Sequence, residues 1–348
     1  MSPRAAPPNS RTAPGSAGRK LTAQPEPDHS GAPGAAGQSA THHSSAPHSQ
    51  QDSANPLPVP SGSPNADATK ASPPQMSVLI PAHNEADYIA DCLCSLFGSE
   101  LPEGLRAEAL VLANGCTDAT VQIAGALTVP PAWHLKVLTL AEGNKIKALN
   151  EGDAQARGDV LIYLDADVTL EPALLGQIAA ALGGPTARYA SGTPQLSPAK
   201  SALSRAYGRF WMRLPFVQNG TPGFGLFAMS RAGRARWQDW PDIIADDTFA
   251  RLNFAPAERV TLPARYSWPL IEGMRNLIRV RRRQNAGVAE LIETHPNLQA
   301  NDDKTPLSPV QLVALLAQDP IGFAAYAMIT VAVQSPLYRS AQRWERGR

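Results

Sequence analysis

The residues best suited to chemistry are two carboxylates that follow an apolar run. Asp165 and Asp167 come directly after residues 160–164, which the sequence predicts to be a central parallel strand covered on both faces. A buried strand offers no solvent for a charge, so both acids must lie where the strand leaves the sheet. Their spacing points both side chains to the same side, at the strand end where open α/β sheets bind ligands.

Two carboxylates this close repel each other unless a cation lies between them. Oxygen donors suit Mg²⁺ or Mn²⁺, which proteins commonly share with substrate phosphates. The alternative is a pair of solvated turn aspartates, the commoner meaning of Asp-x-Asp in an arbitrary sequence. The pair alone does not separate these two interpretations, so the elements that position it matter.

The chain as a whole has 348 residues and a net charge of +1. That length suits one large domain with appendages, or two domains, and the charge gives no general reason to expect nucleic acid. Three cysteines, Cys92, Cys94 and Cys116, are too few for a disulfide framework and favour a reducing compartment. No charged segment followed by an apolar core opens the chain, so we expect a cytoplasmic protein without a secretory signal.

Residues 1–74 are rich in Pro, Ala, Ser, Gly and Thr and contain no aromatic residue or isoleucine. Such a segment cannot bury enough apolar surface to offset the entropy lost on ordering, so we predict that it is disordered. His42, His43 and His48 could form a metal-binding patch, but scattered solvated histidines are the preferred interpretation in this tract.

From residue 75 the chain alternates short apolar runs with amphipathic segments. Strands are predicted at residues 77–80, 109–112, 136–140 and 160–164. Helices are predicted around 89–97, through 121–124, over 145–157 with Gly158 closing the helix, and over 172–182 with a proline in the first turn. Four strands alternating with helices indicate βαβ units and a mostly parallel sheet.

The second half of the ordered region is less regular. Its predicted features are an amphipathic helix over 201–214, a glycine-rich loop over 219–225 that leads into the apolar run 226–229, and an acidic pair at a helix start, Asp246 and Asp247. Short strands around Val260 and Tyr266 and a basic helix over 272–286 follow.

Residues 321–338 are almost wholly apolar and are followed by four arginines. Three alternatives stay open: a helix packed on the domain, a helix lying in the plane of a membrane, and a spanning segment. We therefore expect a possible peripheral membrane contact through 320–348, and a division into a tail (1–74), an α/β domain (75–290) and a C-terminal helical segment (291–348).

Four short motifs follow one another along the chain, and their order supports a resemblance to a known family. They are residues 81–85 (Pro-Ala-His-Asn-Glu), 114–118 (Asn-Gly-Cys-Thr-Asp), 158–167 ending in Asp-Ala-Asp, and the pair Asp246-Asp247. Over about residues 75–290 the chain resembles family 2 glycosyltransferases of the GT-A fold, and Lys145 adds a fifth point of likeness. Neither G-x-G-x-x-G after the first strand nor G-x-x-x-x-G-K-[ST] is present, which disfavours a Rossmann dehydrogenase and a P-loop NTPase.

The resemblance implies a role for each matching residue. The nucleotide pocket would be lined by Pro81, Ala82, Glu85, Asp118 and Lys145. Asp165 would face the ribose or the metal, and Asp167 would bind the metal beside the diphosphate. Asp247, preceded by Asp246, would be the general base. Arg281 and Arg283 look like the two arginines of the family's Gln-Arg-x-Arg-Trp element, in which Val280 and Gln284 replace the glutamine and the tryptophan.

The activity implied is inverting transfer of a single sugar from a nucleotide-sugar donor, most readily a UDP-sugar, to a hydroxyl acceptor, with Mg²⁺ or Mn²⁺ and no nucleic acid. Ala113 stands where many members carry a base-contacting aspartate, which leaves the nucleotide open. The altered arginine element argues against a processive polymerase. The rival functions are a non-catalytic protein of GT-A shape and a sugar nucleotidyltransferase.

Each residue also has a purely structural interpretation. Asp246 and Asp247 could cap a helix, Glu85 could supply first-turn charge, and Lys145 could be a solvated helix residue. The arginine helix could bind a partner, an anionic membrane or nucleic acid instead of a diphosphate.

Overall fold

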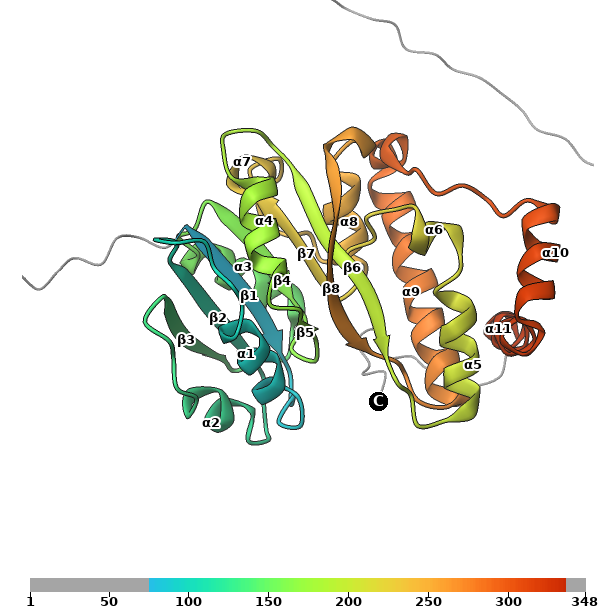
Figure 1. The fold of residues 1–348 in the computed structure, drawn as a ribbon, viewed down its shortest axis with the longest axis horizontal. Helices are drawn as coiled ribbons and strands as arrows, with labels where there is room; N and C mark the ends of the chain where they lie inside the picture. The colour runs from blue at the N-terminus through green and yellow to red at the C-terminus, as the bar shows by residue number, and fades with distance from the viewer. Residues whose placement is uncertain (1–74, 336–348) are drawn as a thin grey trace, which may run out of the picture. The chain divides into compact units, whose positions relative to one another are not determined.

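An eight-stranded sheet runs through residues 75–335, the part of the chain that the computed structural model describes (Figure 1). The strand order is β3-β2-β1-β4-β7-β6-β8-β5. The strands are β1 (Met76–Ala82), β2 (Ala107–Asn114), β3 (Trp133–Leu140), β4 (Val160–Leu164), β5 (Thr169–Leu170), β6 (Tyr189–Ser197), β7 (Leu226–Ser230) and β8 (Arg259–Pro269). The predictions made for 1–74 and 336–348 lie outside the described residues.

The sheet is mostly parallel, as predicted. Strands β1 to β4 pair in parallel, β7 is antiparallel to both β4 and β6, β6 and β8 pair in parallel, and the short β5 is antiparallel to β8. Helices lie on both faces. The predicted α/β fold class, with a mostly parallel sheet flanked by helices, is confirmed.

Two apolar clusters cover the two faces of the sheet. Val78, Ile80 and Ile162 belong to the cluster that includes α1, α2 and α4. Leu79 and Tyr163 belong to the other, which includes α3 and α8. All five residues of β4 are buried, because alternate side chains enter opposite clusters. This explains why the strand reads as an unbroken apolar run.

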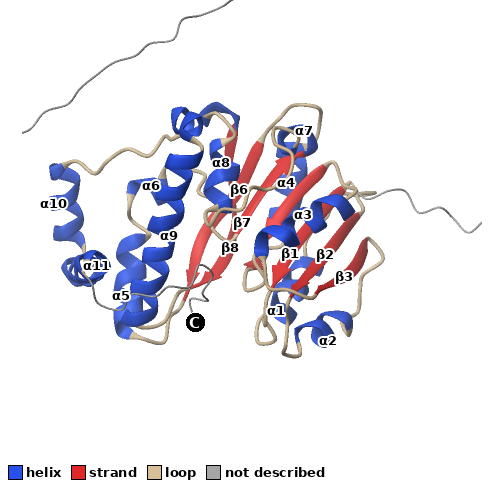
Figure 2. Ribbon diagram, turned by 180° about the vertical axis from the view of Figure 1, so that it is seen from behind, coloured by secondary structure: helices blue, strands red, loops and turns tan. Residues whose placement is uncertain are grey.

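Single helices separate strands β1 to β4, pairs of helices separate β6, β7 and β8, and three helices follow β8. The helices are α1 (Ile89–Phe97), α2 (Thr120–Gly125), α3 (Lys145–Gln155), α4 (Leu174–Leu182), α5 (Ala202–Trp211), α6 (Pro215–Gln218), α7 (Arg231–Arg234), α8 (Asp246–Leu252), α9 (Met274–Thr294), α10 (Pro309–Gln318) and α11 (Pro320–Gln334), with 3₁₀ turns η1 (Pro256–Glu258) and η2 (Pro296–Asn301). Figures 1 and 2 show α5, α9 and α11 together beyond the β6–β8 end of the sheet.

Two strands were not predicted, β5 and β6, and the two short strands expected around Val260 and Tyr266 are one strand, β8. Strand β6 contains Gly192 and Pro194, which are poor strand formers in isolation. It forms because it pairs with β8, and the register shifts between Ser191 and Thr193. This bulge accommodates the interior Pro263 of β8.

Gly158 was predicted to close a helix, and this is wrong. Helix α3 already ends at Gln155, and Ala156 is extended. Similarly, α4 begins at Leu174, so Pro172 precedes it rather than standing in its first turn. Gly158 has another reason to be glycine: a Cβ atom there would lie 2.6 Å from the backbone of Met76 and Ser77 in β1.

Replacing Gly158 by alanine should therefore destabilise the fold. Backbone atoms of a central strand cannot move aside, so we expect the free energy of unfolding to fall by about 2 kcal/mol or more. Gly125→Ala is the matched control, because a Cβ atom there would meet nothing within 4 Å. Urea denaturation of both variants measures the difference, and equal midpoints would contradict the close approach.

The C-terminal helices pack on the rest of the unit. Helix α9 runs through residue 290, so the predicted division at that point falls inside a helix, and the division into domains stays a prediction. Helix α11 contacts α5 and α9 and buries Gly322, Ala325 and Ile329. Among residues 75–335, no helix combines the length and the apolar character needed to cross a bilayer.

Candidate functional site

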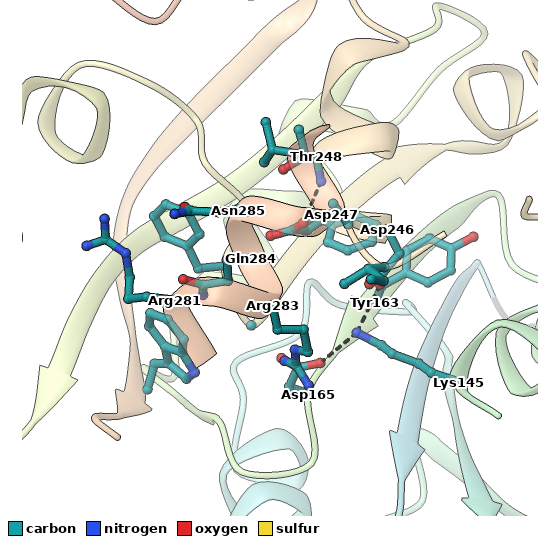
Figure 3. A pocket seen from close by; sticks show the side chains of 18 of the residues that line it. Lys145, Tyr163, Asp165, Asp246, Asp247, Thr248, Arg281, Arg283, Gln284 and Asn285 are labelled. Atoms are coloured by element: carbon teal, nitrogen blue, oxygen red, sulfur yellow. Dashed lines mark hydrogen bonds and ion pairs between the residues drawn. The ribbon is translucent and has the colours of Figure 1, made fainter. Parts of the chain in front are cut away.

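A cavity of about 290 Å³ opens beyond the carboxyl end of β4, between β7, α8 and α9 (Figure 3). Seven residues predicted for the site line it. They are Pro81, Lys145, Asp165, Asp246, Asp247, Arg281 and Arg283. Residues separated by more than a hundred positions in the sequence therefore meet at one place.

The loops that follow β1 and β2 interlock at the neighbouring strand ends. Asn84, with a positive φ of 54°, accepts hydrogen bonds at its Oδ1 from the backbone N–H groups of Thr117 (2.6 Å) and Asp118 (3.2 Å). The Asp118 carboxylate accepts from the backbone N–H of Ala86 (3.1 Å) and from the Thr120 hydroxyl (2.5 Å). Two of the sequence motifs thus hold each other in place.

Lys145 joins two of the acids. Its ammonium lies 2.9 Å from Asp246 Oδ2 and 3.4 Å from Asp165 Oδ1, as the dashed lines in Figure 3 show. Although burial alone would lower the pKa of Lys145, the charges of Asp165 and Asp246 raise it above its ordinary value. Lys145 is therefore a charged member of the cluster and not a solvated helix residue.

Asp247 differs from its neighbours in its environment. Burial, and then the charge of the adjacent Asp246, raise its pKa from 3.8 to about 6. Its Oδ1 accepts a hydrogen bond from the backbone N–H of Thr248 at 2.6 Å, in the first turn of α8. A carboxylate whose pKa lies this close to neutrality can be ionised at pH 7 and still accept a proton readily.

Helix α9 supplies the basic side of the cavity. Arg281 donates a hydrogen bond to the Tyr207 hydroxyl (2.6 Å), and its guanidinium lies 5.3 Å from the centre of the Tyr326 ring. Figure 3 shows Arg281 and Arg283 leaving the helix in different directions. Gln284 also lines the cavity, whereas Val280 is buried in the packing of α9.

Three aromatic side chains form a wall of the cavity, and the sequence analysis did not predict that they meet. Phe224 stacks on Trp268 with ring centres 5.9 Å apart and meets Trp211 at 5.1 Å. The glycines on either side of Phe224 have positive φ. The carbonyl oxygen of Gly225 accepts a hydrogen bond from the backbone N–H of Asp165 (2.8 Å). These aromatic residues come from α5, β8 and a loop that lie far apart in the sequence, so no local sequence pattern predicts that they meet.

Lys304 was also missed. It lines the cavity and a smaller adjoining hollow that shares Phe216, Phe224 and Thr248 with it. The preceding acids anchor its loop: Arg251 donates to Asp302 (2.8 Å) and to Asp303 (2.6 Å), and Arg259 also donates to Asp303 (2.9 Å). Burial and the charge of Arg251 lower the pKa of Lys304.

Four predicted site residues do not line the cavity itself: Ala82, Glu85, Asp118 and Asp167. Ala82 accepts a hydrogen bond from the Cys116 thiol (3.3 Å), and the backbone N–H of Glu85 donates to Thr120 (2.7 Å), so both belong to the interlocked loops. Asp167 lies in the turn between β4 and β5, two residues beyond Asp165.

The side chains near the cavity limit how a metal ion could be held there. Within residues 75–335, no group of three or more His, Cys, Asp or Glu side chains is arranged to hold one. Mg²⁺ is commonly held by only one or two carboxylates, and substrate phosphates and water complete its shell. Asp165 lines the cavity and Asp167 lies two residues beyond it, so the two carboxylates match that number, and their part as metal ligands stays a prediction.

Comparison with known proteins matches a long stretch of the chain to a protein family. The model of the family described as Glycosyl transferase family 2 matches residues 77–257, which contain the motifs of the interlocked loops, β4 and α8. Among curated proteins, the probable glycosyltransferase YdaM of Bacillus subtilis (strain 168) is 36% identical over 101 residues, and glycosyltransferase AglE of Haloferax volcanii is 35% identical over 95.

These relatives match in part only. The alignments cover 28% and 27% of this chain, and they span 24% of YdaM and 31% of AglE. Among solved structures, mannosyltransferase PcManGT of Pyrobaculum calidifontis in complex with GDP-Man and Mn²⁺ aligns over 75% of both chains, with 23% identity and a TM-score of 0.46. S. aureus TarS 1-349 in complex with UDP aligns over 73% of this chain and 70% of its own, with 16% identity and a TM-score of 0.44.

Proposed function

Because the chain belongs to glycosyl transferase family 2, we propose that it transfers one sugar from a nucleotide-sugar donor to a hydroxyl acceptor, with inversion at the anomeric carbon. The observation that carries the proposal is the cavity in which Asp165, Asp246 and Asp247 converge with Lys145 and two arginines. We take a UDP-sugar as the first donor to test and Mg²⁺ or Mn²⁺ as the cation.

The donor would lie across the acidic and basic sides of the cavity. Asp165 and Asp167 would hold the cation next to the diphosphate, where it would stabilise the negative charge of the leaving nucleotide. Arg283 and Arg281 would add positive charge on the other side. Pro81, Ala82, Glu85 and Asp118 would shape and support the nucleotide end through the interlocked loops.

Asp247 would act as the general base. A hydroxyl is a weak nucleophile until a positioned group takes its proton, and Asp247 lines the cavity at a pKa near 6. Attack from the side opposite the leaving diphosphate gives inversion. Lys145 would hold Asp246 and Asp165 in place, since its ammonium contacts both carboxylates.

The aromatic wall and Lys304 would receive the acceptor. Flat apolar rings such as Trp268 and Phe224, which both line the cavity, offer a face for a sugar ring or another apolar ring. Lys304 stands where the cavity continues into the smaller hollow. The acceptor would therefore enter between the aromatic wall and Lys304.

Hydrolysis of a panel of UDP-sugars with Mn²⁺ tests the proposal without knowledge of the acceptor. The parent protein should release UDP, and Asp167→Ala should abolish the release. Asp159→Ala is the matched control, because Asp159 is exposed at the opposite end of β4. Parent-like release by Asp167→Ala would refute the assignment. If the parent released nothing from any donor, a non-catalytic role would be favoured.

The pH dependence of kcat/KM follows from the environment of Asp247. Below a pH of about 6 its carboxylate takes up a proton and can no longer act as a base. We expect kcat/KM to fall about tenfold per pH unit below that point and to level off above it. A pH profile measured with saturating Mn²⁺ checks this, and a flat profile between pH 5 and pH 8 would contradict it.

A further inference from the structure

Helix α10 is apolar and yet buries none of its residues. Gln311 and Gln318 are the only polar side chains among its ten residues. Val310 is 79% exposed and Val313 is 64% exposed. A helix that is apolar all round is normally buried in a protein core or in lipid. Figures 1 and 2 show α10 at the outer edge of the described unit, beside α11.

Helix α11 continues this exposed apolar surface. Ile321 and Val331 are 70% and 68% exposed, and Met328 lies between them. Their spacing of seven and then three residues places them on one side of the helix. The side with Ala325 and Ile329 packs on α5 and α9. Helix α11 therefore has one apolar face in the protein and a second facing solvent.

The surface is distinct from the rest of the described chain. Eight large apolar side chains in residues 75–335 are strongly exposed, and seven of them lie on α10 and α11. We name these seven the α10–α11 surface: Val310, Leu312, Val313, Leu316, Ile321, Met328 and Val331. Between residues 305 and 338 the one charged residue is Asp319, which is buried and paired with Arg209 at 2.7 Å.

We propose that the α10–α11 surface docks on an anionic lipid bilayer. Neither helix can cross a bilayer, so the contact lies in the plane of the membrane surface. The sequence directly after α11 supplies the matching charge: residues 336–348 contain four arginines and one glutamate, with Tyr338 and Trp344 among them. Apolar helices next to a basic, aromatic-bearing tract have the composition of an interfacial anchor for anionic lipid.

Charge also favours lipid over a second copy of this chain. The sequence after α11 carries four arginines and one glutamate, a charge that complements an anionic bilayer but not an identical copy of the same chain. A bilayer would also bury the same apolar side chains. The inference does not depend on the transfer reaction, because docking is measured without donor or acceptor.

Co-sedimentation with vesicles tests the proposal. The full chain should pellet with phosphatidylcholine vesicles that contain phosphatidylglycerol, and much less with phosphatidylcholine alone. Substituting aspartate for Val313, Ile321 and Val331 together should weaken binding by at least about tenfold. Ile292→Asp is the matched control, since Ile292 is the eighth strongly exposed apolar side chain and lies on α9, outside the surface.

Replacing the four terminal arginines by glutamine tests the electrostatic part. This variant should lose the preference for phosphatidylglycerol and the sensitivity of binding to salt. Equal pelleting of the parent and the triple aspartate variant would overturn the proposal. Light scattering that showed a parent dimer, dissociated by the triple substitution, would also overturn it, because a second copy would then occupy the surface.

Discussion

Asp247→Asn should reduce sugar transfer by about a hundred- to ten-thousandfold, because the amide cannot take the proton of the acceptor hydroxyl. Asparagine keeps the size of the side chain and an oxygen that can accept the hydrogen bond from Thr248 N–H. Donor binding should therefore survive. The measurement is the rate of sugar transfer at saturating donor, together with the Kd for UDP.

The same substitution should stabilise the fold at neutral pH. The pKa of Asp247 is raised to about 6 in the folded protein, so its ionised form is costly there compared with the unfolded chain. That cost is present above pH 6 and disappears as the pH falls below the ordinary value of 3.8. Asp247→Asn should gain up to about 3 kcal/mol of unfolding free energy at pH 7 and nothing at pH 3.5.

Asp239→Asn serves as the control, since Asp239 is exposed. It should change neither transfer nor stability. If Asp247→Asn transferred sugar at the parent rate, Asp247 would not be the general base. Lost activity combined with lower stability at pH 7 would indicate a structural role for the carboxylate.

Lys145→Met should have the second large effect. Without the Lys145 ammonium, the carboxylates of Asp165, Asp246 and Asp247 leave three negative charges around one partly buried site. We expect the free energy of unfolding to fall by about 2 to 4 kcal/mol at pH 7, since removing one partner leaves the other charges uncompensated. The loss should shrink as the pH falls and the carboxylates take up protons.

Lys147→Met provides the comparison, two residues along the same helix. The Lys147 side chain is 68% exposed and pairs with Glu142 at the surface. An exposed pair contributes at most about 1 kcal/mol, so its loss should be small at every pH. Urea denaturation from pH 4 to pH 8 distinguishes the two variants. Equal losses would mean that Lys145 does not balance the acid cluster.

The first half of the fold was predictable because its strands are buried on both faces. Strands β1, β2 and β4 each contain an unbroken apolar run, at residues 78–80, 109–113 and 160–164, and polar residues of the site follow their ends. Local patterning was therefore enough to place Asp165 at a strand end and Asp246 at a helix start. Strand boundaries were less accurate: β1 extends through Pro81 to Ala82, beyond its last pairing with β4 at Leu79.

The second half depends on contacts that no local pattern encodes. Strand β6 has weak strand formers and exists through its pairing with β8, which also explains why Pro263 does not divide β8 in two. The aromatic wall joins residues from three elements, and Lys304 reaches the cavity because Asp303 pairs with two buried arginines. Only the folded chain brings these residues together.

In the proposed mechanism, the acids at the end of β4 and the start of α8 form one site for a diphosphate and a cation. Diffraction from crystals soaked with UDP and Mn²⁺ tests it directly, because manganese gives an anomalous signal. We expect a manganese peak within bonding distance of the Asp165 or Asp167 carboxylate, with the diphosphate between it and α9. A peak elsewhere, or a nucleotide bound outside the cavity, would contradict it.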